Sequence, residues 1–270
     1  MPVLQLGQND GLYYELDRPA EDGKQTFVFV NPITGDLSMW QQEIAPALRE
    51  AGYGTLCYNF RGQAASPYAE GTDLTADLIA GDLQHLVAAL SIERPVLVGL
   101  SIGGLYCARA FLAGCPAEAL VLINTLRRIG PRLAWMNDAT LRLMSVAGPA
   151  LMRDVMTPLL FGPDYLAAHR HEFLQPDTAY EPLDPKSGAH NLLTWMGKTD
   201  WDVPWEQLTC PVLVTMGPND RIFYDADIVA ELQALLPNAT RVDVPEAGHM
   251  LPAEAPTRFT AILTEFAAGL

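Results

Sequence analysis

The stretch Gly99-Leu100-Ser101-Ile102-Gly103-Gly104 limits most strongly what this chain can fold into. The apolar run 94–98 before it predicts a buried strand, and 105–112 after it is apolar at helical spacing. Ser101 therefore stands where a strand turns sharply into a helix, and the flanking glycines, which lack a Cβ, allow a tight turn. This is the context that a G-x-S-x-G nucleophile turn requires, with the positive end of a helix dipole beside the serine. The motif alone is also compatible with an ordinary glycine-rich turn.

The composition bounds the class of protein. The chain has 270 residues, 49% of them apolar, which is enough for a large core in one domain or two. Its 17 Lys and Arg stand against 32 Asp and Glu, a formal net charge of −15. This balance argues against nucleic acid and anionic membrane surfaces as partners. We see no signal-peptide pattern, no apolar segment long enough to span a bilayer and no C-x-x-C spacing, so we expect a cytoplasmic protein with free thiols.

Strands and helices alternate along most of the sequence. Runs that are apolar on both faces, as parallel strands buried in a sheet are, occupy 26–30, 94–98, 119–124 and 210–216. Helical patterns separate them, among them 38–50 and the closing stretch 253–268. The alternation predicts an α/β fold with a mostly parallel central sheet flanked by helices.

The alternation stops between 125 and 204. This segment has a helical pattern that is rich in Met and Trp and broken at Gly130-Pro131, Gly148-Pro149 and Gly162-Pro163. We interpret it as a helical cap or lid inserted into a core made of residues 1–124 and 205–270. Soft Met and aromatic side chains suit an apolar pocket, although most of them can equally form the core of the insertion itself.

Three predicted strand ends present Ser101, Asp220 and His249, in the order nucleophile, acid, base. This is the chain order of the α/β-hydrolases. His249 would remove the proton of Ser101 during attack, and Asp220 would fix the imidazole tautomer. Rival acids are nearby, at Asp225, Asp227 and Glu246. The first two fall near a helix start, where capping explains them.

The loop after the strand 26–30 is a candidate oxyanion loop. Its donor would be the backbone N–H of Ile33, because Pro32 has no N–H. The second donor would be the N–H of Ile102. A metal site is not expected, because His169 and His171 are accompanied by no H-E-x-x-H motif or cysteine cluster.

The whole chain resembles the α/β-hydrolase superfamily. More narrowly, Asn31-x-x-x-Gly35-Asp36-Leu37-Ser38-Met39-Trp40, 99–105 and Ile123-Asn124-Thr125 with Arg128-Ile129-Gly130 are similar to 3-oxoadipate enol-lactonases and their esterase relatives. The resemblance implies a cofactor-free hydrolase of an ester or lactone, with the triad and oxyanion loop at the positions named above. Relatives usually carry D-x-R-G-x-G-x-S where this chain has Asn59-Phe60-Arg61-Gly62-Gln63-Ala64-Ala65-Ser66, so the loop that shapes one pocket wall differs.

We therefore expect a serine hydrolase that cleaves a small carboxylic ester or lactone through an acyl-enzyme, as a monomer or homodimer. A thioesterase or C–C bond hydrolase on the same triad, and a slow-turnover ligand-binding sensor, are the alternatives. The candidate substrate contacts are Trp40, Arg128, Trp135 and Trp195. Arg127 and Arg128 could hold a substrate carboxylate by bidentate hydrogen bonds, or could simply be surface charges.

Overall fold

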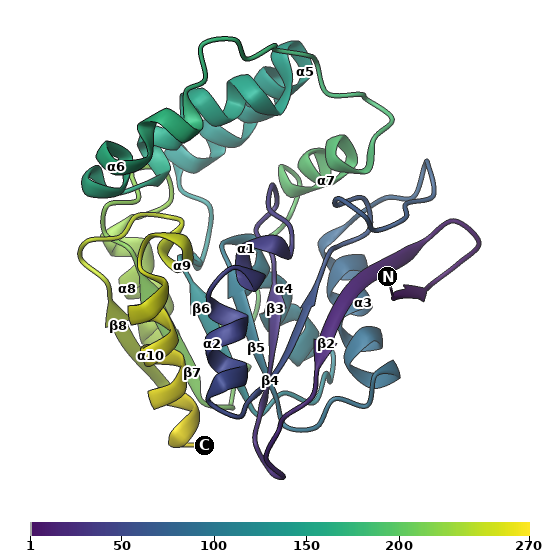
Figure 1. Ribbon diagram of the computed structural model, residues 1–270, viewed down its shortest axis with the longest axis vertical. Helices are drawn as coiled ribbons and strands as arrows, with labels where there is room; N and C mark the ends of the chain where they lie inside the picture. Colours follow the sequence, from purple (N-terminus) through teal and green to yellow (C-terminus); the bar gives the residue numbers. More distant parts are fainter. Residues whose placement is uncertain (1) are drawn as a thin grey trace.

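A single eight-stranded sheet forms the centre of the computed structural model, which describes residues 2–270 (Figure 1). The strands are β1 (Val3–Gln5), β2 (Gly11–Asp17), β3 (Thr26–Val30), β4 (Gly54–Tyr58), β5 (Pro95–Leu100), β6 (Ala119–Ile123), β7 (Val212–Met216) and β8 (Ala239–Asp243). They lie in the order β1-β2-β4-β3-β5-β6-β7-β8. β2 runs antiparallel to β1 and β4, and the other neighbouring pairs are parallel. The predicted α/β fold with a mostly parallel sheet is confirmed.

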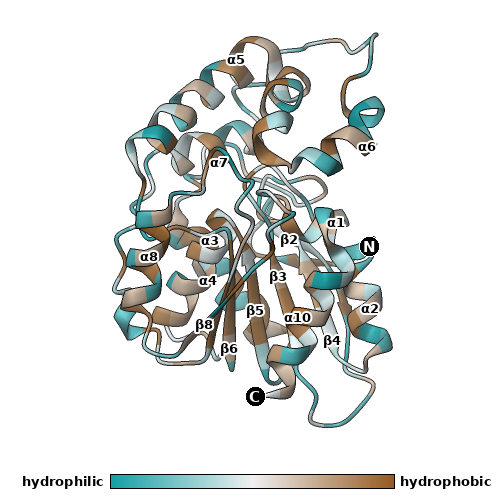
Figure 2. Cartoon of the chain, turned by 90° about the vertical axis from the view of Figure 1, so that its left-hand side faces the viewer, coloured by the Kyte–Doolittle hydropathy of each residue, from teal (hydrophilic) through white to brown (hydrophobic). Residues whose placement is uncertain are grey.

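Helices cover both faces of this sheet. They are α1 (Ser38–Gln41), α2 (Ile44–Glu50), α3 (Ala76–Ala89), α4 (Ile102–Leu112), α5 (Pro131–Leu160), α6 (Pro163–Phe173), α7 (Gly188–Met196), α8 (Ala226–Leu235), α9 (Leu251–Glu254) and α10 (Pro256–Ala268), with the 3-10 turn η1 (Trp205–Gln207). Successive side chains of a strand point to opposite faces, so Phe29 belongs to the buried cluster that includes α2 and α10, while Val28 belongs to the cluster that includes α3, α4 and α8. Figure 2 shows the hydrophobic strands between these two helical layers.

Two helices predicted from the sequence as continuous are each split in two. The stretch 38–50 forms α1 and α2 because Pro46 cannot donate to the carbonyl of Gln42, and its ring would collide with that group. The stretch 253–268 is interrupted at Ala255, whose backbone is non-helical, because it precedes Pro256. In both cases a proline that fits the first turn of the second helix ends the first one.

A helical insertion of α5, α6 and α7 lies between β6 and β7 in the chain and above one end of the sheet (Figure 1). The Gly-Pro pairs predicted as breaks mark it: Pro131 begins α5, Gly148 kinks it with a φ of 75°, and Pro163 begins α6. Because Ser101 at the end of β5 shares a cavity with α5 and α7, the insertion covers the carboxyl end of the sheet.

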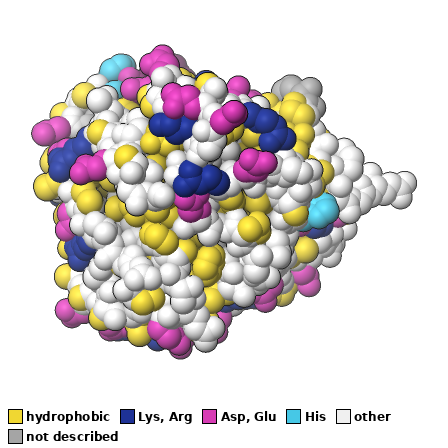
Figure 3. Space-filling model, turned by 90° about the horizontal axis from the view of Figure 1, so that it is seen from below, with side chains coloured by type: hydrophobic (Ala, Val, Ile, Leu, Met, Phe, Trp, Pro, Cys, Tyr) yellow, Lys and Arg dark blue, Asp and Glu magenta, His cyan; other side chains and the backbone are white. Residues whose placement is uncertain are grey.

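The surface mixes both signs of charge. On the lower face, away from the insertion, basic side chains lie among acidic and apolar ones (Figure 3). In the part of the chain from residue 2 onward, no helix combines the length and the apolar character needed to cross a membrane.

Candidate active site

Ser101 lies directly after β5 and immediately before α4, on a strained turn. Its φ of 59° and ψ of −122° are unusual for a residue with a side chain. Its N–H donates to the carbonyl of Ile123 at 2.8 Å, which ties the turn to β6. A Cβ on Gly99 would lie 2.3 Å from the carbonyl carbon of Gly103, and one on Gly103 would lie 2.4 Å from the carbonyl oxygen of Val30. The predicted strand-to-helix turn is present, and both glycines are required by close backbone contacts.

Asp220 and His249 follow β7 and β8 and meet at the same end of the sheet. Asp220 Oδ2 lies 2.6 Å from His249 Nδ1, and both residues are buried. Asp220 Oδ1 accepts from the N–H groups of Ile222 at 3.0 Å and Phe223 at 2.8 Å, so both carboxylate oxygens have partners. The ring of Phe223 stacks on the imidazole, with 4.0 Å between centroids. These contacts fix the plane of the imidazole and leave Nε2 as its outward nitrogen.

The rival acids have other partners. Asp225 is the N-cap of α8, where its Oδ1 accepts from the N–H of Ile228, and Asp227 lies in the first turn of that helix. Glu246 forms an ion pair with Arg258 at 2.8 Å. Among the acids considered from the sequence, Asp220 is the one in contact with His249.

Ser101 and His249 line a cavity of about 90 Å³ between the strand ends and the insertion. Apolar side chains make up most of its walls: Ile33, Leu133, Met136, Met152, Met156, Leu160, Leu193, Met196, Ile222, Phe223 and Met250. Within the described residues, the lining contains no Lys, Arg, Asp or Glu. Ser101 Oγ and His249 Nε2 form no hydrogen bond in this conformation of residues 2–270, and such catalytic bonds often tighten only with substrate.

The two expected oxyanion donors come from the loop after β3 and from the start of α4. Ile33 lines the cavity in the loop after β3, and Ile102 opens α4 directly after Ser101. Along the described chain, neither backbone N–H donates to a carbonyl or side chain of the protein. An N–H at the first turn of a helix has no partner inside that helix, so it is available to an anion.

Asn124 joins the two loops that carry the acid and the base, a role that our sequence reasoning did not identify. Its Nδ2 donates to the carbonyls of His249 at 2.8 Å and Gly248 at 3.1 Å, and its Oδ1 accepts from the N–H of Gly217 at 2.8 Å. The residue has a φ of 46°, which asparagine tolerates better than most residues. Two signals were available in the sequence: the asparagine directly follows a buried strand, and it lies in one of the motifs that resemble the enol-lactonases.

Glu254 is a second residue that the sequence pattern did not reveal. Its two carboxylate oxygens accept from the N–H of Gly162 at 2.6 Å and from the N–H of Gly248 at 2.9 Å. Gly162 is the N-cap of α6, and Gly248 precedes His249. Glu254 therefore ties the insertion to the histidine loop. Burial raises the pKa of this carboxyl above its ordinary value, although the two N–H donors act in the opposite direction.

Two of the four side chains that were expected to contact substrate contact other groups of the protein instead. Trp40 is fully buried, stacks on Phe29 and donates from Nε1 to Asn31 Oδ1 at 2.8 Å. Arg128 forms a bidentate pair with Glu231 at 2.8 and 2.9 Å on the surface. Neither side chain lines the Ser101 cavity, so the expectation is corrected for both: Trp40 is part of the core and Arg128 is a paired surface cation.

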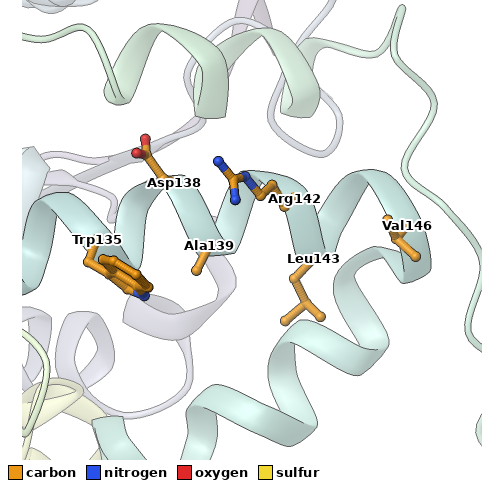
Figure 4. Close-up of a pocket in the computed structure, with 6 residues that line it drawn as sticks. All are labelled: Trp135, Asp138, Ala139, Arg142, Leu143 and Val146. Carbon is orange, nitrogen blue, oxygen red and sulfur yellow. The ribbon is translucent and has the colours of Figure 1, made fainter.

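The other two expected contacts lie on the insertion, also outside the cavity. Trp195 is half-buried, and Lys198 Nζ lies 4.5 Å from the centroid of its ring. Trp135 is 76% exposed and lines a surface groove of about 510 Å³ on one face of α5, with Asp138, Ala139, Arg142, Leu143 and Val146 (Figure 4). Met136, the next residue, faces the Ser101 cavity. The helical phase of α5 thus separates Trp135 from the serine.

Arg127, the other cation considered for a substrate carboxylate, is also paired. Its Nη2 lies 2.7 Å from Asp202 Oδ1. Residues 2–270 contain no group of three or more His, Cys, Asp or Glu side chains placed to hold a metal ion.

Comparisons with known proteins identify the family and the fold of this chain. The chain belongs to the alpha/beta hydrolase family, whose model matches residues 27–262. RutD from Caulobacter sp. (strain K31), named as a candidate carbamate hydrolase, is 26% identical over 279 aligned positions, which cover 98% of this chain and 99% of that protein.

Solved structures share the fold over almost the full chain. The enol-lactonase from Burkholderia xenovorans LB400 superimposes with a TM-score of 0.81 at 24% identity, covering 99% of this chain and 100% of that one. A thermophilic esterase from Thermogutta terrifontis gives a TM-score of 0.80 at 22% identity, covering 99% and 97%.

Proposed function

We propose that this alpha/beta hydrolase is a serine hydrolase that cleaves a small, neutral carboxylic ester or lactone through an acyl-enzyme. The observation that carries the proposal is the 2.6 Å contact between the fully partnered Asp220 and Nδ1 of His249, whose ring lines the same cavity as Ser101. A serine hydroxyl is a poor nucleophile until a base takes its proton, and His249 is the base within reach of that cavity.

The mechanism follows from these positions. Ser101 Oγ attacks the carbonyl carbon of the ester, and its proton passes to His249 Nε2. Asp220 accepts the Nδ1–H, which fixes the tautomer and stabilises the imidazolium. The tetrahedral oxyanion receives hydrogen bonds from the N–H groups of Ile33 and Ile102. His249 then protonates the leaving oxygen, and a water molecule activated by the same imidazole releases the acid from Ser101.

The cavity walls support a neutral substrate of modest size. Its lining is mainly aliphatic, aromatic and methionine side chains, with no cation to hold a carboxylate. The two arginines considered for that purpose are paired on the surface with Asp202 and Glu231. We further propose that residues 125–204 act as a cap that closes this cavity over residues 1–124 and 205–270, because α5 and α7 supply much of the lining.

The same triad could serve related reactions. A thioesterase, a C–C bond hydrolase and a slow-turnover sensor differ from an esterase in the leaving group or the rate, which the cavity walls do not encode. The full-length similarity to a candidate carbamate hydrolase adds a fourth substrate class. We place an ester or lactone first because its leaving oxygen takes its proton from His249 and departs as an alcohol, so the serine, the imidazole and the apolar walls of the cavity are sufficient.

Steady-state hydrolysis tests the proposal. The substrates are p-nitrophenyl acetate and butyrate, a p-nitrophenyl ester whose acyl chain ends in a carboxylate, an enol-lactone, an acyl thioester and a p-nitrophenyl carbamate. We expect Ser101-dependent turnover that is fastest with a neutral ester or lactone and at least tenfold slower with the anionic ester. Equal rates for wild type and Ser101→Ala would refute the mechanism. If the thioester or the carbamate is turned over faster than the esters, the catalytic role of the triad stands and the proposed substrate class is wrong.

A further inference from the structure

Gln63, in the turn after β4, is buried and uses every hydrogen-bonding position of its side-chain amide. Oε1 accepts from Asn31 Nδ2 at 3.2 Å and from the N–H of Phe60 at 3.0 Å. Nε2 donates to the carbonyls of Pro32 at 3.0 Å and Ile33 at 3.2 Å. The reverse orientation of the amide would set an NH₂ against two donors and an oxygen against two carbonyls, so the network admits one orientation.

The Pro32 carbonyl and the Ile33 N–H are the two ends of one peptide unit. This peptide is trans, so its C=O and N–H point in opposite directions. The Pro32 oxygen accepts from Gln63 Nε2 at 3.0 Å and from the N–H of Gly35 at 3.2 Å, so these two donors together set the direction of the Ile33 N–H. Because the carbonyl is hydrogen-bonded, the peptide is more polarised and its N–H is a stronger donor. Pro32 and Ile33 both line the Ser101 cavity.

Further buried hydrogen bonds hold the loop after β3 against the turn that carries Gln63. Asn31 Nδ2 also donates to the Tyr58 carbonyl at 2.9 Å and to Asn59 Oδ1 at 3.2 Å. Trp40 Nε1 supplies the donor for Asn31 Oδ1 at 2.8 Å. The loop after β3 and the turn after β4 are thus joined by side-chain amides that have protein partners and lie out of water.

We propose that Gln63 is a positioning residue of the oxyanion hole, which aims and polarises the Pro32–Ile33 peptide so that the Ile33 N–H meets the developing oxyanion. The proposal rests on the proposed serine hydrolase function. Gln63 acts through Ile33, since its own amide atoms are all committed to protein partners. Gln63 lies in the turn 59–66, which departs from the family pattern at Asn59 and Ala64.

Gln63→Glu and Gln63→Met test the proposal, since both keep the side-chain length and remove the two N–H donors. Gln84→Glu is the matched control, because Gln84 Nε2 also donates to a backbone carbonyl, that of Ala113, but on the exposed side of α3. The measurements are kcat and KM for p-nitrophenyl acetate and the inhibition constants of butylboronic acid and butyramide. Ser101 Oγ bonds to the boron of butylboronic acid, which becomes tetrahedral and places an oxygen where the oxyanion forms. Butyramide keeps a planar carbonyl and therefore reports binding in the ground state.

We expect both Gln63 variants to lose about 10- to 100-fold in kcat, with KM changed less than about twofold. Butylboronic acid should bind weaker by the same factor, butyramide binding should stay unchanged, and Gln84→Glu should match wild type. Folded Gln63 variants with wild-type kcat would overturn the role of Gln63 and leave the proposed function standing. A loss of butyramide binding as large as the loss of boronate binding would also overturn that role, because it indicates general damage to the pocket. Wild type that neither hydrolyses an ester nor binds the boronate would overturn the proposed function, and this inference with it.

Discussion

Asp220 has three hydrogen-bond partners for two oxygens, and each partner requires an acceptor. Asp220→Asn would place an NH₂ either against His249 Nδ1, which selects the wrong tautomer, or against the N–H groups of Ile222 and Phe223. We expect kcat to fall by about 10⁴ with little change in KM. Steady-state kinetics check this, with Glu246→Gln as the control because Glu246 is paired with Arg258 at the surface. Similar losses in the two variants would show that Asp220 has no special role.

Glu254 makes stability depend on pH. Its pKa is raised in the folded protein, chiefly by burial, so the folded state holds the proton more tightly than the unfolded chain. The contribution of this carboxyl to the free energy of unfolding therefore falls as pH rises through its pKa. Because Glu254→Gln removes that titration, the stability of wild type relative to the variant should decrease between about pH 4 and about pH 7.

Urea unfolding at both pH values measures this difference. Glu265→Gln, on the exposed side of α10, controls for the loss of one negative charge. A wild-type advantage over Glu254→Gln that grows with pH would mean that the two N–H donors outweigh burial.

At the residue scale, the sequence predicted those residues whose position in the chain carries the signal. Ser101, Asp220 and His249 each follow a buried apolar strand, and parallel strands bring such ends together. Gln63 and Glu254 have no comparable signal, because each acts through contacts between loops that lie far apart in the sequence. Trp40 was expected to contact substrate, but its ring is buried in the core, because an aromatic residue in a site motif does not reveal which way its ring points.

At the scale of elements, the β5–α4 turn depends on two close backbone approaches. Gly103→Ala would force a Cβ to within 2.4 Å of the Val30 carbonyl oxygen. We expect a loss of about 2–4 kcal/mol in the free energy of unfolding, together with a displaced Ser101 and much lower activity.

Gly81→Ala is the matched control for this substitution. Gly81 lies inside α3 with open space around it, so alanine there should stabilise the protein by about 0.5–1 kcal/mol through helix propensity. Denaturant unfolding of both variants compares the two. A Gly103→Ala protein as stable as wild type would contradict the packing described for the turn.

Periodicity located the helices of this chain better than their ends. The apolar spacing of 38–50 suits one helix, yet Pro46 divides it, and Pro256 does the same near the carboxyl terminus. The apolar pattern on its own predicts a continuous helix in both places, whereas each proline interrupts the preceding helix through its missing N–H and its ring. In the insertion, the Gly-Pro pairs were interpreted as breaks, and the helices begin or kink at each of them.

At the scale of the whole molecule, the sheet and the insertion build the cavity together. Met152 on α5 lines the Ser101 cavity and also two adjoining grooves of about 430 and 300 Å³. Met152→Ala should connect the cavity with these grooves and raise the kcat/KM ratio of p-nitrophenyl octanoate to acetate by about tenfold.

Met136→Ala is the control for the loss of a methionine side chain, since of these three hollows Met136 lines only the cavity. Kinetics over a chain-length series compares the two variants. An unchanged chain-length profile in Met152→Ala would mean that the grooves do not receive the acyl chain.

The alternation of strands and helices predicted the core because each apolar strand is itself a signal for a parallel sheet. The size and lining of the cavity could not be predicted, since they depend on which face of α5 turns toward the sheet. Met136 and Trp135 are neighbours in the sequence, yet the turn of about 100° between them makes one line the Ser101 cavity and the other a surface groove. The boundaries 125 and 204 of the cap remain a prediction.

The central claim is that Ser101 is a nucleophile activated by His249, and covalent labelling tests it most directly. Wild type and Ser101→Ala are incubated with a fluorophosphonate, and intact and fragment masses are measured, with thermal unfolding to verify that both are folded. The account predicts one adduct on wild type, located at Ser101, and none on Ser101→Ala. A folded wild type that stays unlabelled, or an adduct that persists in Ser101→Ala, would contradict it.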